Sequence, residues 1–131
     1  IDNLITKRHE IVHTYGWYLR QYIREAKELG ATPILCSPVP RKKWADGKVV
    51  RSTADGHASW ARQVAAEEQI GFIDLNALVA QRYDALGVAQ VEPLFADENT
   101  HTSRAGAELN AAVVAEALRG LPGEPLAPYL R

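Results

Sequence analysis

The sequence has no methionine and a single cysteine, Cys36, so an internal disulfide bond is excluded while the redox compartment stays open. No apolar run approaches the roughly 18–20 residues that a membrane-spanning helix requires, and no signal peptide is visible. The 15 Lys and Arg and the 16 Asp and Glu are interspersed and nearly balance, at a net charge of −1. Because the charges balance, the sequence does not predict a basic surface that would bind nucleic acid or an anionic membrane.

Hydrophobic periodicity predicts an alternation of helices and strands. Apolar residues at helical spacing predict a first helix from Tyr15 to Leu29, with Thr14 as its N-cap and Gly30 at its end. Two short apolar runs, at 32–37 and 71–75, are typical of strands buried on both faces.

The remaining elements follow from the same patterns. We expect Trp17 and Trp60 to be core residues, because each has apolar neighbours at helical spacing. Further helices are expected around 60–65, from Asn76 to Leu86 and from Ser103 to Leu118, with loops at 38–55 and 88–102.

This order of elements predicts parallel strands joined by right-handed crossovers, and hence an α/β layered fold. Two central strands are too few for a stable parallel sheet with both faces covered. We therefore expect the missing strands to come from sequence before Ile1 or from another chain, so that residues 1–120 form only part of a domain. The proline-rich residues 121–131 are expected to be a tail.

The segment HEIVH, residues 9–13, fits H-E-x-x-H, in which two histidines one helical turn apart bind zinc and the glutamate acts as general base. A catalytic zinc site needs a third protein ligand. Leu19 stands where the longer version of this pattern has a histidine, and the next glutamates fall on the same expected helix. We therefore expect no metal at His9 and His13, and a zinc peptidase ranks behind the functions below.

His101 is the strongest candidate for chemistry. It lies in a polar loop just before a capped helix, with the carboxylates of Glu98 and Asp97 three and four residues upstream. A carboxylate that accepts the proton of one ring nitrogen leaves the other nitrogen free to act as a base. The spacing alone favours the alternative, a histidine at a helix cap beside two solvated acids.

The stretch ENTHTSRAGAELNA, residues 98–111, resembles the C-terminal catalytic block of the SGNH (GDSL-like) hydrolases, most closely the rhamnogalacturonan acetylesterases. HEIVHTYGWYLRQYI, GATPILCSPVPRKKWADGKVVR and FIDLNALVAQRY resemble the same group, in the same order. The resemblance implies the C-terminal half of a flavodoxin-like three-layer α/β/α fold. It also implies an esterase that removes acetyl groups from pectic rhamnogalacturonan or a related polysaccharide, without a cofactor, in a secreted or periplasmic location.

Carried over by position, the resemblance makes His101 the general base of a Ser-His-Asp triad and puts the acid at Glu98, where the family has aspartate. Asp97 is the alternative acid. The family's Gly-Asp-Ser nucleophile block and oxyanion-hole blocks are absent, because in the family they precede the point where Ile1 begins. Ser37 ends a strand, where α/β active sites gather, but lacks the nucleophile context.

The loop at 38–51 follows that same strand end, so Arg41, Trp44 and Arg51 are candidates for substrate binding. Sugar rings stack on aromatic faces, and arginine holds the carboxylates of galacturonate in bidentate pairs. The alternative is a surface loop with solvated charges and Trp44 packed inward. The rival to an esterase is a non-catalytic fragment or carbohydrate-binding remnant.

Overall fold

The computed structural model describes residues 2–3, 8–9, 11–123, 126 and 129, with side chains from Ile11 onward. At its centre, β3 (Ile34–Cys36) and β6 (Gly71–Ile73) form a parallel pair. Two small antiparallel pairs accompany it: β1 (Asp2–Asn3) with β2 (Arg8–His9), and β4 (Trp44–Ala45) with β5 (Lys48–Val49). The chain is therefore an α/β structure with a short parallel sheet.

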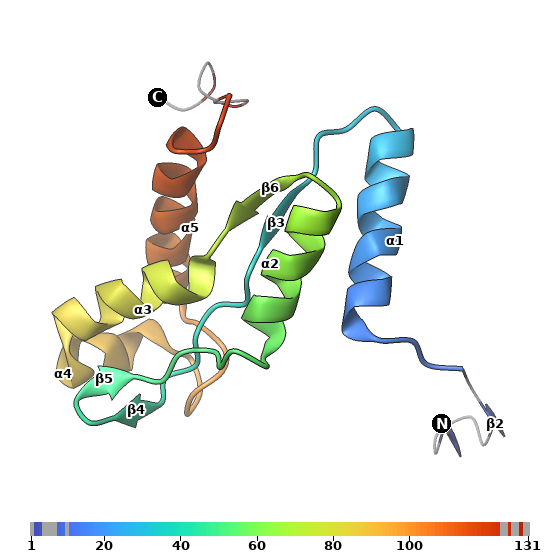
Figure 1. Ribbon diagram of the computed structural model, residues 1–131. Helices are drawn as coiled ribbons and strands as arrows, with labels where there is room; N and C mark the ends of the chain where they lie inside the picture. Colours follow the sequence, from blue (N-terminus) through green and yellow to red (C-terminus); the bar gives the residue numbers. More distant parts are fainter. Residues whose placement is uncertain (1, 4–7, 10, 124–125, 127–128, 130–131) are drawn as a thin grey trace.

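Helices lie on both sides of this sheet (Figure 1). Helix α2 (His57–Glu67) packs against β3 and β6, and α1 (Tyr15–Glu28) packs on α2. Helix α5 (Arg104–Arg119) contacts β6 from the other side and is joined there by α3 (Leu75–Leu86). Both α1 and α2 lead into their strands through short reversals, so their N-terminal ends lie near the carboxyl ends of the strands (Figure 1).

The main core lies between the sheet, α3 and α5. Tyr83 of α3 is fully buried, and its ring meets Phe95 edge-on at 5.8 Å between centroids. Burial raises the pKa of the Tyr83 hydroxyl, since the phenolate would lose its hydration. The buried members of this cluster are Val49, Ile73, Leu75, Val79, Ala80, Tyr83, Val91, Phe95 and Val113.

The first and last helices match the sequence prediction closely, because polar caps define their starts. The Thr14 hydroxyl accepts a hydrogen bond from the amide of Trp17 at 3.3 Å, and Ser103 caps α5 in the same way. Gly30 after α1 adopts a φ of 78°, a left-handed conformation that a side chain disfavours.

The third helix begins earlier than predicted. The strand β6 ends at Ile73, and Asp74 is the N-cap of α3, accepting from the amide of Ala77 at 3.2 Å. The apolar run at 71–75 predicts a strand up to Leu75, because Leu75 is apolar. The competing signal was Asp74, whose short carboxylate favours a helix start.

Two regions predicted as loops contain structure. A β4–β5 hairpin turns at Asp46 and Gly47, both with positive φ (50° and 75°), as Asp-Gly in a tight hairpin requires. The segment before His101 contains α4 (Val88–Val91) and a 3-10 turn, η1 (Glu92–Leu94). The Asp-Gly pair was a usable signal for the hairpin, whereas the helical turns are too short to show periodicity.

The prediction that Trp17 and Trp60 are core residues is wrong. Their side chains lie at the surface, with 39% and 41% of their area exposed. Among the described residues, no helix combines the length and apolar character needed to cross a bilayer.

Candidate functional site

Backbone contacts between residues 94–96 and residues 101–103 close the loop that contains His101. Phe95 and Thr102 form an isolated antiparallel bridge, and the amide of Ala96 donates to the carbonyl of His101 at 2.8 Å. The amide of Ser103 then donates to the carbonyl of Leu94 at 2.9 Å. His101 therefore lies at the base of a tight turn formed by residues 97–100, in a short hairpin-like loop whose two ends are fixed.

The start of α5 docks tightly onto the turn below this loop. The Ser103 hydroxyl donates to the carbonyl of Pro93 at 2.8 Å and accepts from the amide of Gly106 at 3.3 Å. A Cβ atom at Gly106 would lie only 2.1 Å from the carbonyl oxygen of Leu94. The Ser-Arg-Ala-Gly sequence at 103–106 thus serves two structural purposes. Ser103 caps α5, and Gly106 allows the helix to lie against the backbone of Leu94.

Asp97 organises the tip of the loop. One carboxylate oxygen accepts from the amides of Asn99, Thr100 and His101 at 3.1, 2.7 and 2.9 Å, and the other contacts Nδ1 of the His101 ring. The backbone amides of Thr100 and His101, followed by the His101 ring, hold the pKa of Asp97 at about 2. An ionised carboxylate can only accept, so Nδ1 carries the proton. This leaves Nε2 as the basic nitrogen, on a side chain that is 81% exposed.

Glu98, the acid that the resemblance favours by position, lies elsewhere on the loop. Its side chain is exposed, and within the described residues its carboxylate has no hydrogen-bond partner. The geometry brings the alternative acid, Asp97, to His101 instead. The reason is local: a carboxylate four residues back can reach both the amides of the turn and the ring, in the manner of an Asx turn.

The loop after β3 lies beside the His101 loop. The amide of Lys42 donates to the carbonyl of Asn99 at 3.0 Å, and its ammonium pairs with Glu92 at 2.7 Å and lies 5.5 Å from the centre of the Phe95 ring. Its neighbour Arg41 is exposed and forms no ion pair within the described residues. Sequence reasoning missed Lys42, and only its place next to Arg41 could have suggested it.

Trp44 and Arg51, the other two predicted substrate residues, are used structurally. The Trp44 ring packs against the main core, and its Nε1 is buried without a partner among the described residues. The Arg51 guanidinium pairs with Asp84 at 2.6 Å and donates to the carbonyl of Val49 at 3.1 Å. The amide of Val49 and then Arg51 hold the pKa of Asp84 below its usual range. Of the three candidates, only Arg41 lies beside the His101 loop with a free side chain.

Ser37 is unsuited to nucleophilic attack as it stands. Only 2% of it is exposed, and its hydroxyl donates to Asp74 at 3.0 Å while accepting from the amide of Asn76 at 2.8 Å. The Asn76 side chain then holds the carbonyl of Pro38 and the amide of Ser52, at 3.0 and 2.8 Å. Ser37 therefore ties the carboxyl end of β3 to the start of α3.

The HEIVH segment lacks the geometry of a zinc helix. His9 belongs to β2, while His13 lies in the non-helical segment before α1, where its ring stacks on Trp17 at 3.8 Å between centroids. Glu10 is outside the described residues. Within the part of the chain that the structure describes, no three His, Cys, Asp or Glu side chains are grouped as metal ligands.

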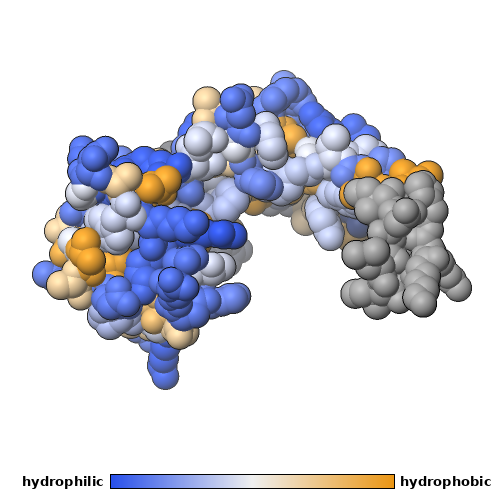
Figure 2. All heavy atoms as spheres, turned by 90° about the horizontal axis from the view of Figure 1, so that it is seen from below, coloured by the Kyte–Doolittle hydropathy of each residue, from blue (hydrophilic) through white to orange (hydrophobic). Residues whose placement is uncertain are grey.

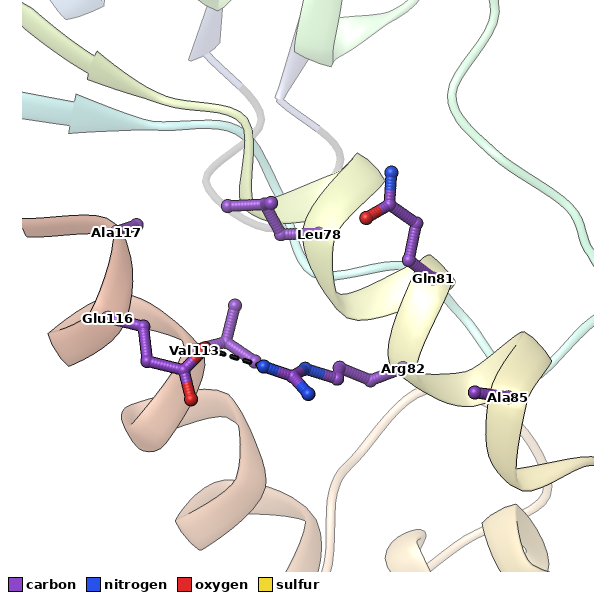
Figure 3. Close-up of a pocket in the computed structure, with 7 residues that line it drawn as sticks. All are labelled: Leu78, Gln81, Arg82, Ala85, Val113, Glu116 and Ala117. Atoms are coloured by element: carbon purple, nitrogen blue, oxygen red, sulfur yellow. Dashed lines mark hydrogen bonds and ion pairs between the residues drawn. The ribbon is translucent and has the colours of Figure 1, made fainter. Parts of the chain in front are cut away.

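The surface hollow between α3 and α5 does not include His101. This groove of about 430 Å³ has a mixed lining of four apolar side chains with Gln81, Arg82 and Glu116, and an ion pair of Arg82 with Glu116 at 2.5 Å bridges it (Figure 3). The site around His101 is an exposed loop at the carboxyl end of the sheet, where open α/β sheets bind ligands.

Known proteins resemble the chain over most of its length. It is 34% identical over 116 residues to "Probable rhamnogalacturonan acetylesterase YesY" of Bacillus subtilis, an alignment that covers 83% of the chain and 53% of that protein. It is 28% identical to rhamnogalacturonan acetylesterase RhgT of the same organism, over 89% of the chain and 56% of that protein. A third match, to rhamnogalacturonan acetylesterase of Emericella nidulans, is 27% identical and covers 82% of the chain.

A solved structure agrees with these matches. The crystal structure of the protein YxiM of Bacillus subtilis superimposes with a TM-score of 0.72 at 28% identity, covering 80% of the chain and 30% of that protein. No protein-family model matches the chain. The chain spans about half the length of the curated relatives it matches most fully. Over that half, the chain is a homologue of the rhamnogalacturonan acetylesterases, which belong to the SGNH hydrolases.

Proposed function

We propose that the chain is the base-bearing part of an SGNH-type acetylesterase, with His101 as general base and Asp97 as the acid that orients it. The observation that carries the proposal is the contact of an ionised Asp97 with Nδ1 of His101. This contact fixes the tautomer in which Nε2 can accept a proton. The homology to acetylesterases supports acyl transfer as the reaction.

The proposed reaction proceeds in two steps through an acetyl-enzyme. A serine hydroxyl from a part of the domain outside these residues attacks the acetyl carbon while Nε2 of His101 takes its proton. His101 then returns the proton to the sugar oxygen that leaves. In the second step His101 takes a proton from water, which attacks the acetyl carbon, and acetate is released as the serine regains its proton. Asp97 stabilises the imidazolium that forms in both steps.

The proposed substrate is an acetylated polysaccharide that contains uronate, as the names of the relatives suggest for those proteins. Arg41 and Lys43 support this choice, because both are exposed beside the His101 loop and neither is in an ion pair within the described residues. Guanidinium and ammonium groups are suited to hold carboxylates along a sugar chain.

The proposal is tested on the chain supplied with the rest of the domain, fused or as a second chain, using p-nitrophenyl acetate. Asp97→Asn should lower kcat by at least about 100-fold with little change in KM, since the acid acts mainly in the transition state. Glu98→Gln is the matched control, a neighbouring acid without a contact to the ring, and should retain nearly full activity.

Three results would count against the proposal. A large loss in Glu98→Gln with a small one in Asp97→Asn would move the acid to Glu98. Full activity in His101→Asn would remove the base. A folded two-part protein without esterase activity would favour the rival function, a carbohydrate-binding remnant.

A further inference from the structure

The two exposed tryptophans draw attention to the region where α1 and α2 begin. A cavity of about 480 Å³ lies between these helices, lined from α1 by Tyr15, Gly16 and Arg20 and from α2 by Trp60, Gln63 and Val64, with Thr14 at its edge. This volume is within the roughly 300–1,000 Å³ typical of small-molecule sites.

The aromatic wall of the cavity is held in place by ring contacts. The rings of Tyr15, His57 and Trp60 form a triangle: the His57 centroid is 4.9 Å from Tyr15 and 5.1 Å from Trp60, and Tyr15 is 6.4 Å from Trp60. Such edge-on and tilted pairs stabilise a fixed arrangement. The Trp60 ring, although 41% exposed, is therefore held in a defined position.

The lining of the cavity also includes polar groups with defined partners. Gln63 donates to one carboxylate oxygen of Glu67 at 2.8 Å, and Arg20 donates to the other. The side-chain oxygen of Gln63, Oε1, has no hydrogen-bond partner within the described residues, and the Arg20 guanidinium has further N–H donors. The cavity thus combines an aromatic face with an amide acceptor and guanidinium donors.

The cavity lies at the same end of the fold as His101. The N-terminal ends of α1 and α2, like the orange loop before α5, lie at the lower side in Figure 1, where the strands end. Figure 2 views the molecule from this side and shows a mostly hydrophilic surface with small hydrophobic patches. A polysaccharide bound at His101 extends over many rings, so further rings must be accommodated along this side.

We propose that the α1–α2 cavity is a sugar-binding subsite, in which a pyranose ring stacks on Trp60 and Gln63 and Arg20 bind its hydroxyl groups. A pyranose has apolar C–H faces and a polar rim, which match the aromatic and polar walls of the cavity. The proposal rests on the proposed function in one respect: the ring belongs to the polysaccharide that is deacetylated at His101.

The test is a titration of the 131-residue chain with de-esterified rhamnogalacturonan oligosaccharides, followed by two-dimensional NMR and tryptophan fluorescence. Binding should be saturable and shift the amide signals of residues that line the cavity. Trp60→Ala should weaken it about tenfold, the loss of one aromatic stacking contact. Trp17→Ala is the matched control, because Trp17 is equally exposed on the same helix pair but does not line the cavity. It should change the affinity less than about twofold.

Gln63→Ala, a change at an exposed side chain, provides a second variant if Trp60→Ala disturbs folding, and should also weaken binding. The proposal is overturned if the wild-type chain shows no saturable binding at millimolar oligosaccharide. It is equally overturned if Trp17→Ala and Trp60→Ala weaken binding alike, or if Gln63→Ala has no effect. Because binding is measured without turnover, a chain that binds but whose completed form is not an esterase would contradict the proposed function alone.

Discussion

At the scale of single residues, Gly106 determines how closely α5 approaches the turn below His101. Gly106→Ala would place a methyl group 2.1 Å from the Leu94 carbonyl oxygen, an obstacle that belongs to the backbone and cannot rotate away. We expect a loss of about 1–3 kcal/mol in the free energy of unfolding, as in other overpacked sites. Urea denaturation measures this, and hydrogen exchange should show faster opening at Ala96 and Ser103.

The control for this substitution is Gly120→Ala at the other end of the same helix. A Cβ there would meet only the Ala117 carbonyl at 3.6 Å, and Gly120 has a φ of −93° that any residue adopts. It should change stability by less than about 0.5 kcal/mol. Equal destabilisation by both substitutions would mean that the contact with Leu94 does not explain the effect. Helix propensity could not explain it either, because alanine favours a helix more than glycine does.

Single residues also mark how far the sequence could predict the site. His101 stood out because its loop is polar and precedes a capped helix, and the spacing kept both Glu98 and Asp97 as possible acids. Choosing between them needs the path of the backbone, since the three amides that bind Asp97 face one carboxylate only after the turn has formed. Arg51 was selected for its charge, but charge alone does not reveal a partner such as Asp84, 33 residues further along the chain.

At the scale of elements, local signals predicted the regular structure well where caps and periodicity agreed. Thr14 and Ser103 capped the helices that follow them, and both parallel strands lie within the predicted apolar runs. The failures came from tertiary context. Trp60 has helical spacing and apolar neighbours, yet its helix turns this ring toward a surface cavity, which periodicity cannot distinguish from a core.

Lys42 connects three of these elements: the loop after β3, the η1 turn and the His101 loop. Lys42→Met keeps the length of the side chain but removes its ion pair with Glu92 and its charge over the Phe95 ring. We expect a loss of about 1 kcal/mol in stability, with the backbone bond to Asn99 weakened. Amide hydrogen exchange at Lys42 and His101 should report the loosening.

Lys43→Met is the matched control, since the next residue carries an exposed ammonium group without an ion pair within the described residues. It should leave exchange in the His101 loop unchanged. If the two methionine variants behave alike, the contacts of the Lys42 side chain do not order the loop, and the backbone bond to Asn99 is sufficient.

At the scale of the whole molecule, the parallel pair leaves one edge of β3 without a partner in the described structure. The amide of Ser37 donates to the carbonyl of Ile73 at 3.0 Å, so by alternation the backbone groups of Ile34 and Cys36 face the other edge. Beside this edge is a hollow of about 130 Å³ with an apolar lining: Leu19, Tyr22, Ile23, Pro33, Ile34, Leu35 and Ile70. An open edge next to apolar side chains favours association.

We therefore expect the 131-residue chain on its own to bind a hydrophobic dye such as ANS and to associate as its concentration rises. Tyr22, 72% exposed beside the open edge, is the residue to change: Tyr22→Lys should lower dye binding and association, because it adds a charge to this surface. Tyr129→Lys, in the C-terminal tail at 80% exposure, is the control and should have no effect.

Supplying the rest of the domain should abolish dye binding in the wild type, since a neighbouring strand would cover the edge. A chain that is monomeric at all concentrations and does not bind the dye would show that this edge and its apolar surroundings need no partner, and that two strands with their helices form a complete fold.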